Sequence, residues 1–199
     1  MRTEDAETKA KMNSLIAKGD FDSLLAEAER MIDAQPDNFI GYWWRGRALT
    51  LMGRLDDAVR SFYESVKRAD DEAEESKIMA SIANVFNVQR KHDLAEEYAD
   101  ASLELNPGNP VGVLAWGVAL ASTGRRREAS EFVSTNWGTL RDSYEQACGY
   151  SIMGRRGEAM RALRESIAAG PHHRVTALHD PEFRPYLRDP EFRSLTRPS

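Results

Sequence analysis

Side chains that bind metals gather at one place near the C-terminal end of the chain. His172, His173, His179 and Asp180 offer imidazole and carboxylate groups within nine positions. A metal site needs ligands that converge on one point from a fixed backbone, and adjacent histidines in a linker that starts at Pro171 point apart. We therefore expect a solvated linker here, with no metal and no other cofactor.

Cys148 is the single cysteine and the second candidate for chemistry. One cysteine forms neither an internal disulfide nor a multi-cysteine metal site, which is typical of a reducing compartment. As a nucleophile it would need a nearby base or cation to lower its thiol pKa, and no histidine lies near it in sequence. Glycine-rich phosphate loops, Gly-x-Ser-x-Gly and HExxH are also missing from the sequence. We predict no catalytic residues and a protein that is not an enzyme.

Composition limits the partners of this chain. Its 199 residues are 41% hydrophobic and 30% charged, with a formal net charge of −5, which is typical of a soluble folded protein. An acidic balance argues against a nucleic-acid partner, because phosphate backbones require a dense basic face. The opening MRTEDAETKAKMNSL lacks the apolar core of a signal peptide, and no apolar run reaches the roughly 18 residues of a membrane span. We expect a cytoplasmic protein.

The elements that would position any site are paired helices. Two apolar stripes at helical spacing flank a turn at Gly53. The first stripe is Tyr42, Gly46 and Leu49, and the second is Ala58, Phe62 and Val66. The stripes cover each other only if the two helices are antiparallel, and the small residues Gly46 and Ala58 let the backbones approach.

This helix, turn and helix arrangement recurs five times with a spacing of about 34 residues. The turn positions are Gly19, Gly53, Arg90, Gly124 and Gly154. The pattern resembles the tetratricopeptide repeat. The repeats are expected within residues 1–171, at about 5–38, 39–72, 76–109, 110–139 and 140–171. The resemblance implies an all-α, right-handed solenoid of about five helix pairs whose first helices line a concave face.

Two local departures interrupt the strict period. Residues 73–75 are additional and belong to an acidic run that we expect to be a solvated helix end or loop. Asn136-Trp137-Gly138 interrupts the second helix of the fourth repeat, which is therefore expected to be short.

The last segment contains the tandem sequence Asp-Pro-Glu-Phe at 180–183 and again at 189–192. Aspartate followed by proline is typical of a helix N-cap and first helical residue, so each copy predicts a short helix, the first limited by Pro185. Together with Tyr144, Cys148 and Gly154, this segment resembles the bacterial-type end-of-group module of tetratricopeptide chains. The resemblance implies that residues 172–199 form a helical cap on the open face of the last repeat.

The resemblance also implies a non-catalytic protein–protein interaction module that holds a peptide in its concave groove. By register, the groove positions are Lys9, Asn13, Trp43, Trp44, Arg47, Lys77, Asn84, Asn87, Leu114, Val118 and Tyr144. Three of these are basic and none is acidic, which predicts an acidic peptide segment with a bulky apolar anchor near Trp43. Trp43 and Trp44 fit packing between repeats as well as partner contact.

Other readings of the function remain open. Lys9, Asn13 and Lys77 match the carboxylate clamp of chaperone-binding tetratricopeptide domains, but Trp44 and Ser81 replace its remaining Asn and Arg, which disfavours a chaperone tail as ligand. The first alternative is a self-assembling scaffold, a homo-oligomer in which the groove or an end binds a second copy. A metal-dependent enzyme that uses residues 172–180 is a remote alternative. The sequence decides neither the identity of the protein partner nor whether it binds the concave or the convex face.

Overall fold

Helices follow one another throughout the computed structural model, which describes residues 6–197. The expected start of the first repeat at residue 5 and the last two residues of the expected cap lie outside the described residues. Within residues 6–197 there is no strand, so the prediction of an all-α fold is confirmed. No helix in this range has the length and the apolar character that a membrane span requires.

Most of the chain is built from consecutive antiparallel helix pairs. These are α1 (Ala6–Lys18) with α2 (Phe21–Ala34), α3 (Phe39–Leu51) with α4 (Leu55–Val66), α5 (Glu72–Val88) with α6 (His92–Leu105), α7 (Pro110–Ser122) with α8 (Arg126–Thr135), and α9 (Ser143–Ile152) with α10 (Arg156–Ala169). The 3-10 helix η1 (Trp137–Thr139) follows the short α8. The C-terminal segment consists of α11 (His172–His179), the 3-10 helix η2 (Pro181–Tyr186) and α12 (Pro190–Thr196).

Each pair turns through one residue with a positive φ, between 62° and 90°, at all five positions that the sequence marked as turns. The amide that follows donates to a carbonyl five residues earlier, as from Arg54 to Leu49 at 2.8 Å and from Lys91 to Phe86 at 2.9 Å. These bonds satisfy carbonyls at the end of the first helix. Arg90 is the one residue other than glycine with a positive φ in the described chain, a conformation that costs roughly 1–2 kcal/mol for a residue with a Cβ.

Helices α3 and α4 approach most closely around Gly46. A Cβ atom placed there would lie 2.6 Å from Cε1 of Phe62, whose side chain is fully buried. The hydroxyls of Ser61 and Ser65 donate to the carbonyls of Tyr42 and Phe39, each at 2.9 Å, and tie the two helices together. Gly46 therefore makes room for a ring on the partner helix.

Replacing Gly46 with alanine should destabilise the fold. The new methyl group overlaps a buried ring that has no free space, so we expect a loss of about 1–3 kcal/mol in the free energy of unfolding. Gly157→Ala is the matched control, because Gly157 lies in α10 with no atom within 4 Å of its Cβ position. The control should be unchanged or up to about 1 kcal/mol more stable. Equal urea midpoints for the two variants would contradict this account of Gly46.

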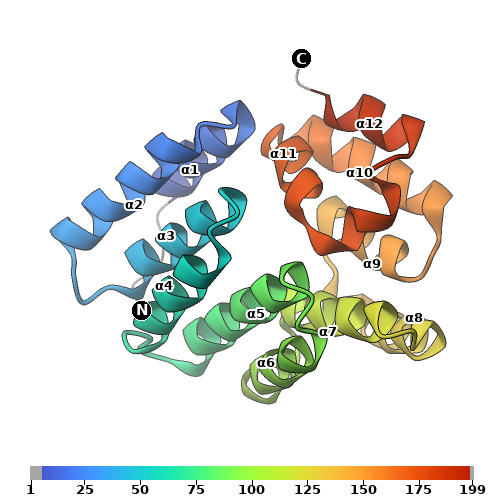
Figure 1. The fold of residues 1–199 in the computed structure, drawn as a ribbon, viewed down its shortest axis with the longest axis horizontal. Helices are drawn as coiled ribbons and strands as arrows, with labels where there is room; N and C mark the ends of the chain where they lie inside the picture. Colours follow the sequence, from blue (N-terminus) through green and yellow to red (C-terminus); the bar gives the residue numbers. More distant parts are fainter. Residues whose placement is uncertain (1–5, 198–199) are drawn as a thin grey trace.

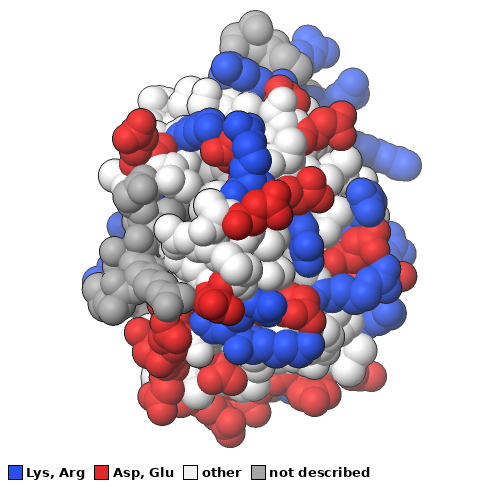
Figure 2. Space-filling model, turned by 90° about the vertical axis from the view of Figure 1, so that its left-hand side faces the viewer, with Lys and Arg blue, Asp and Glu red and all other residues white. Residues whose placement is uncertain are grey.

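Two apolar cores hold the stack together. The first joins α1 to α6 and includes Met12, Trp44 and Ile78, while the second joins α7 to α12 and includes Leu163 and Phe192. Helices α5 and α7 pack against each other between them. The outer face seen in Figure 2 mixes basic and acidic side chains, so its described part offers no continuous basic surface.

The two ends of the helical stack meet. Figure 1 shows the pairs arranged as an arc, with α11 beside α1, and these two helices pack against each other. Val175 contacts the first core, and the ring of His179 lies edge-on to Phe21 with centroids 5.6 Å apart. The expectation of a solvated linker at residues 172–180 is therefore wrong. Buried Thr176 and Ala177 drive this stretch into a packed helix instead.

The two Asp-Pro-Glu-Phe copies adopt different structures. Asp189 caps α12, because its carboxylate accepts hydrogen bonds from the amides of Glu191 and Phe192. Asp180 occupies the equivalent position before η2, but its side chain makes no cap hydrogen bond. The first copy forms a 3-10 helix that contains Pro185, which removes a backbone donor and limits its length.

The C-terminal segment should be required for stability. Phe183 and Phe192 are fully buried and stack with centroids 5.6 Å apart, so removal of residues 172–199 exposes apolar surface on both cores. We expect the deletion to lower the melting temperature and to promote aggregation. Phe192→Ala alone should cost about 3–5 kcal/mol. Leu187→Ala, at a residue that is 44% exposed, is the control and should cost about 1 kcal/mol or less. A deletion variant as stable and soluble as the full chain would show that the segment is not a cap.

Candidate functional site

A cavity of about 670 Å³ lies inside the arc. Helices α1, α3 and α5 form one side of it, and α9, α11 and η2 form the opposite side. Nine of the eleven residues expected to face the groove line this cavity. They are Lys9, Asn13, Trp43, Trp44, Arg47, Lys77, Asn84, Leu114 and Tyr144. The structure thus brings these residues together around one space.

The other two expected groove residues lie elsewhere. Asn87 is fully buried, and its Nδ2 donates to the carbonyl of Ala115 in α7 at 2.7 Å. Three positions along a helix leave two side chains about 60° apart around the axis, and this difference directs Asn87 toward α7 while Asn84 lines the cavity. Val118 lines a separate cavity of about 700 Å³, one helical turn beyond Leu114.

Two tryptophans form the floor of the cavity beneath basic side chains. Nζ of Lys77 lies 3.6 Å from the ring centroid of Trp43, and Cζ of Arg47 lies 5.0 Å and 4.9 Å from the rings of Trp43 and Trp44. Nε1 of Trp43 donates to Oγ of Ser81 in α5 at 3.0 Å. The tryptophans therefore pack between neighbouring helix pairs and also line the cavity.

The cavity has a basic and an acidic wall. Lys9, Arg47 and Lys77 form the basic wall, on α1, α3 and α5. The opposite wall carries four carboxyl groups from the start of α9 and the start of η2, namely Asp142, Glu145, Asp180 and Glu182. The cavity therefore carries basic side chains on one side and acidic side chains on the other.

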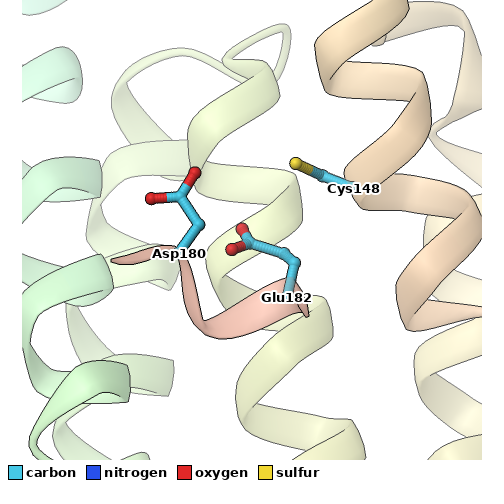
Figure 3. A group of neighbouring side chains, drawn as sticks. All are labelled: Cys148, Asp180 and Glu182. Carbon is cyan, nitrogen blue, oxygen red and sulfur yellow. The ribbon is translucent and has the colours of Figure 1, made fainter. Parts of the chain in front are cut away.

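A thiol and two carboxyl groups form a tight cluster on the acidic wall. One ligand atom each from Cys148, Asp180 and Glu182 lies within 4.8 Å of the others, and Figure 3 shows the three side chains directed into the same space. The hydroxyl of Tyr144 donates to Oδ2 of Asp180 at 2.7 Å. Burial raises the pKa of Asp180 to about 6, although the Tyr144 hydrogen bond and Arg47 lower it. Burial and then the charge of Asp180 raise the pKa of Glu182 to about 8.

These surroundings do not activate Cys148 as a nucleophile. Burial, followed by the charges of Glu182 and Asp180, raises the pKa of its thiol well above the usual range. A thiolate is the reactive form, and a metal cation or another positive charge is what would stabilise it. At neutral pH the Cys148 thiol is therefore protonated in this environment.

The histidines of α11 line the same cavity as packed rings. His173 stacks on Tyr144 with centroids 4.5 Å apart, and its Nδ1 lies 2.9 Å from the carbonyl oxygen of Ser166. Burial, then His173, Arg47 and Lys9, lower the pKa of His172 to about 4. The imidazoles are thus used in packing.

A comparison with protein families identifies a segment that is similar to known repeats. The family model described as "Tetratricopeptide repeat" matches residues 10–74. These residues are therefore similar to tetratricopeptide repeats. No curated protein sequence matches the chain.

Solved structures extend the likeness in fold beyond the matched segment. One structure of MamA has a TM-score of 0.51 at 19% identity and covers 83% of this chain and 95% of its own. A structure titled "MamA AMB-1" has a TM-score of 0.51 at 24% identity. The match covers 79% of this chain and 94% of that chain. Helices stacked in pairs like those of a tetratricopeptide solenoid are therefore common to these chains, and identities this low show the fold alone.

The tetratricopeptide register did not anticipate the acidic wall. That register names positions on first helices, whereas Asp180 and Glu182 come from a segment that folds back across the arc. Each Asp-Pro-Glu-Phe copy supplies one pair of carboxyl groups. The sequence feature that distinguishes the first copy from the second is Pro185, which lies in the short helix of the first copy only. The long-range contact itself has no local signature.

Tyr144→Phe should test the hydrogen bond that joins α9 to the segment before η2. Loss of the hydroxyl leaves the partly buried carboxylate of Asp180 without this donor, so we expect a loss of about 1–3 kcal/mol in stability at pH 7.5. Tyr150→Phe is the control, because Tyr150 packs through its ring on Trp137 and Arg155. Equal unfolding midpoints for both variants would contradict a stabilising role of the Tyr144 hydrogen bond.

Proposed function

We propose that this chain is a non-catalytic protein-interaction module that holds an acidic, extended segment of a partner protein in the cavity. The basic wall above two tryptophans is the observation that carries the proposal. Lys9, Arg47 and Lys77 belong to three different helices that line one space. A segment that crosses the three helices would meet a cation at each step.

Arg47 is well placed to bind a carboxylate. Its guanidinium lies about equally far from both tryptophan rings, which support its flat face. A planar guanidinium held in this way can offer paired donors to a carboxylate with little further loss of conformational freedom. Arg47 is therefore our choice for the central anion contact.

Asn84 supports the binding of an extended backbone. Its Oδ1 is buried and accepts no hydrogen bond within the described chain, and the residue lines the cavity. Buried polar atoms are nearly always satisfied, so an amide N–H from a bound segment is a suitable donor.

The apolar part of the cavity suits one bulky side chain. Trp43, Leu114 and Val111 line it together, and Val111 is 42% exposed. Buried aromatic residues that meet an apolar side chain commonly dominate binding energy. The volume lies within the usual range of ligand sites, and we infer that an extended segment occupies it.

The type of the C-terminal module and the cellular compartment are also part of the proposal. We infer that residues 172–197 are an end-of-group module, and the tandem Asp-Pro-Glu-Phe supports this. The single, unpaired Cys148 supports a reducing compartment such as the cytoplasm.

Charge reversal on the basic wall tests the binding proposal. The probe is a fluorescently labelled peptide with one leucine between aspartate and glutamate residues, compared with the same peptide carrying lysines. We expect the acidic peptide alone to bind and Arg47→Glu with Lys77→Glu to weaken its binding at least tenfold, measured by fluorescence anisotropy. The control, Arg161→Glu with Arg188→Glu, makes the same change in net charge at exposed positions outside the cavity.

Two further measurements complete this test. A pull-down followed by mass spectrometry would identify a partner, whose acidic segment then replaces the model peptide. Native affinity of the Arg47 and Lys77 double variant for that partner would show that the cavity is not the binding site. Light scattering after size-exclusion chromatography would separate this function from a scaffold, because self-assembly depends on protein concentration.

A further inference from the structure

The cluster of Cys148, Asp180 and Glu182 resembles a ligand set more than a packing arrangement. Helix α9 supplies the thiol, and the start of η2 supplies both carboxyl groups across Pro181 (Figure 3). Ligand atoms around tetrahedral zinc lie roughly 3.3–3.8 Å apart, given bonds of about 2.0–2.3 Å. Movement of the side chains by about 1 Å would bring the present separations, all within 4.8 Å, into that range.

A second observation points to a missing ligand. Glu182 is only 8% exposed, and its Oε2 is buried with no hydrogen-bond partner in the described chain. A buried polar oxygen without a hydrogen-bond partner is disfavoured and is rare in folded proteins. A bound cation would supply the interaction that this oxygen lacks.

The second Asp-Pro-Glu-Phe copy shows how the same sequence is satisfied by ordinary ion pairs. Asp189 lies 2.7 Å from Arg156, and Glu191 lies 2.7 Å from Arg164 and 3.1 Å from Arg156. In the first copy, Cys148 stands against the carboxyl groups. The charge of Arg47 lowers the pKa of Asp180, and the charge of Arg184 lowers the pKa of Glu182.

We propose that Cys148, Asp180 and Glu182 bind a zinc-like divalent cation. The inference goes beyond the proposed interaction function and does not depend on it. A thiolate ligand favours zinc or cobalt over calcium and magnesium, which prefer oxygen ligands alone. Three protein ligands leave a fourth position open to the cavity, where a water molecule or a carboxylate of a bound segment can coordinate.

Neighbouring groups are arranged to support such a site. The Tyr144 hydrogen bond to Oδ2 of Asp180 orients that carboxylate, as outer partners of metal ligands commonly do. A cysteine binds a metal as the thiolate, so binding would release the thiol proton of Cys148 to solvent. Proton release is thus a measurable consequence of binding.

Titration of the metal-free, tag-free full chain with cobalt(II) tests the proposal. We expect saturable 1:1 binding, thiolate-to-cobalt charge-transfer absorption in the near ultraviolet, and intense visible bands typical of tetrahedral cobalt. Zinc should displace the cobalt and abolish both signals. In weakly buffered solution near pH 7, at least one proton should be released for each ion bound, because the thiol must lose its proton.

Variants assign the ligands. Cys148→Ser should remove the charge-transfer band, and Glu182→Gln and Asp180→Asn should each weaken binding at least tenfold. Glu191→Gln is the matched control from the second tandem copy and should bind as the unaltered protein does. His173→Asn checks the neighbouring imidazoles and should also retain the band. Circular dichroism would verify folding, and if Cys148→Ser does not fold, the two carboxyl variants decide the outcome.

Three results would overturn the site. They are the lack of saturable binding, binding without a charge-transfer band, and an unchanged spectrum in Cys148→Ser. Loss of cobalt binding in His173→Asn alone would place the ion on the histidines of α11 and would equally refute the proposed ligand set.

Discussion

The closure of the helical arc by its own C-terminal segment is the contact on which the rest of the structure depends. A stack of helix pairs leaves an apolar face open at each end. Here α12 packs on α10, while α11 packs on α1, so that one segment contacts both ends. Burial of Phe183 and Phe192 holds this segment in place. Because the arc is closed, its concave side becomes a cavity with walls on both sides.

Closure also determines the electrostatics of that cavity. The first helices of the repeats supply basic side chains, and the returning segment supplies Asp180 and Glu182 opposite them. Charges in such a space are screened less than on an open surface. An acidic segment would therefore favour one wall and a cation the other.

The local features of this fold could be predicted from the sequence, and the long-range ones could not. Helical periodicity and turn residues such as Gly53 and Arg90 depend on neighbours within a few positions, and the structure places a turn at each. The positions of Trp43, Arg47 and Lys77 within their helices were enough to predict that these residues face one cavity. Helical position alone misplaced Asn87, whose packing depends on the longer α5 and on Ala115 of α7. Residues 172–180 were expected in a solvated linker because nothing in their own sequence reports that α1 lies beside them.

The tandem Asp-Pro-Glu-Phe shows how location decides the chemistry of a short motif. Around the second copy, α10 presents Arg156 and Arg164, so the carboxylates are neutralised at the surface and Asp189 is available to cap α12. Around the first copy, Pro185 shortens the helix and the carboxyl groups turn inward to Tyr144 and Cys148. Burial then makes their ionisation costly, and a ligand that restores the charge balance would recover that free energy. A sequence that serves only as a cap beside α10 thus becomes a candidate binding site beside α9, because α9 offers the thiol of Cys148 where α10 offers two guanidinium groups.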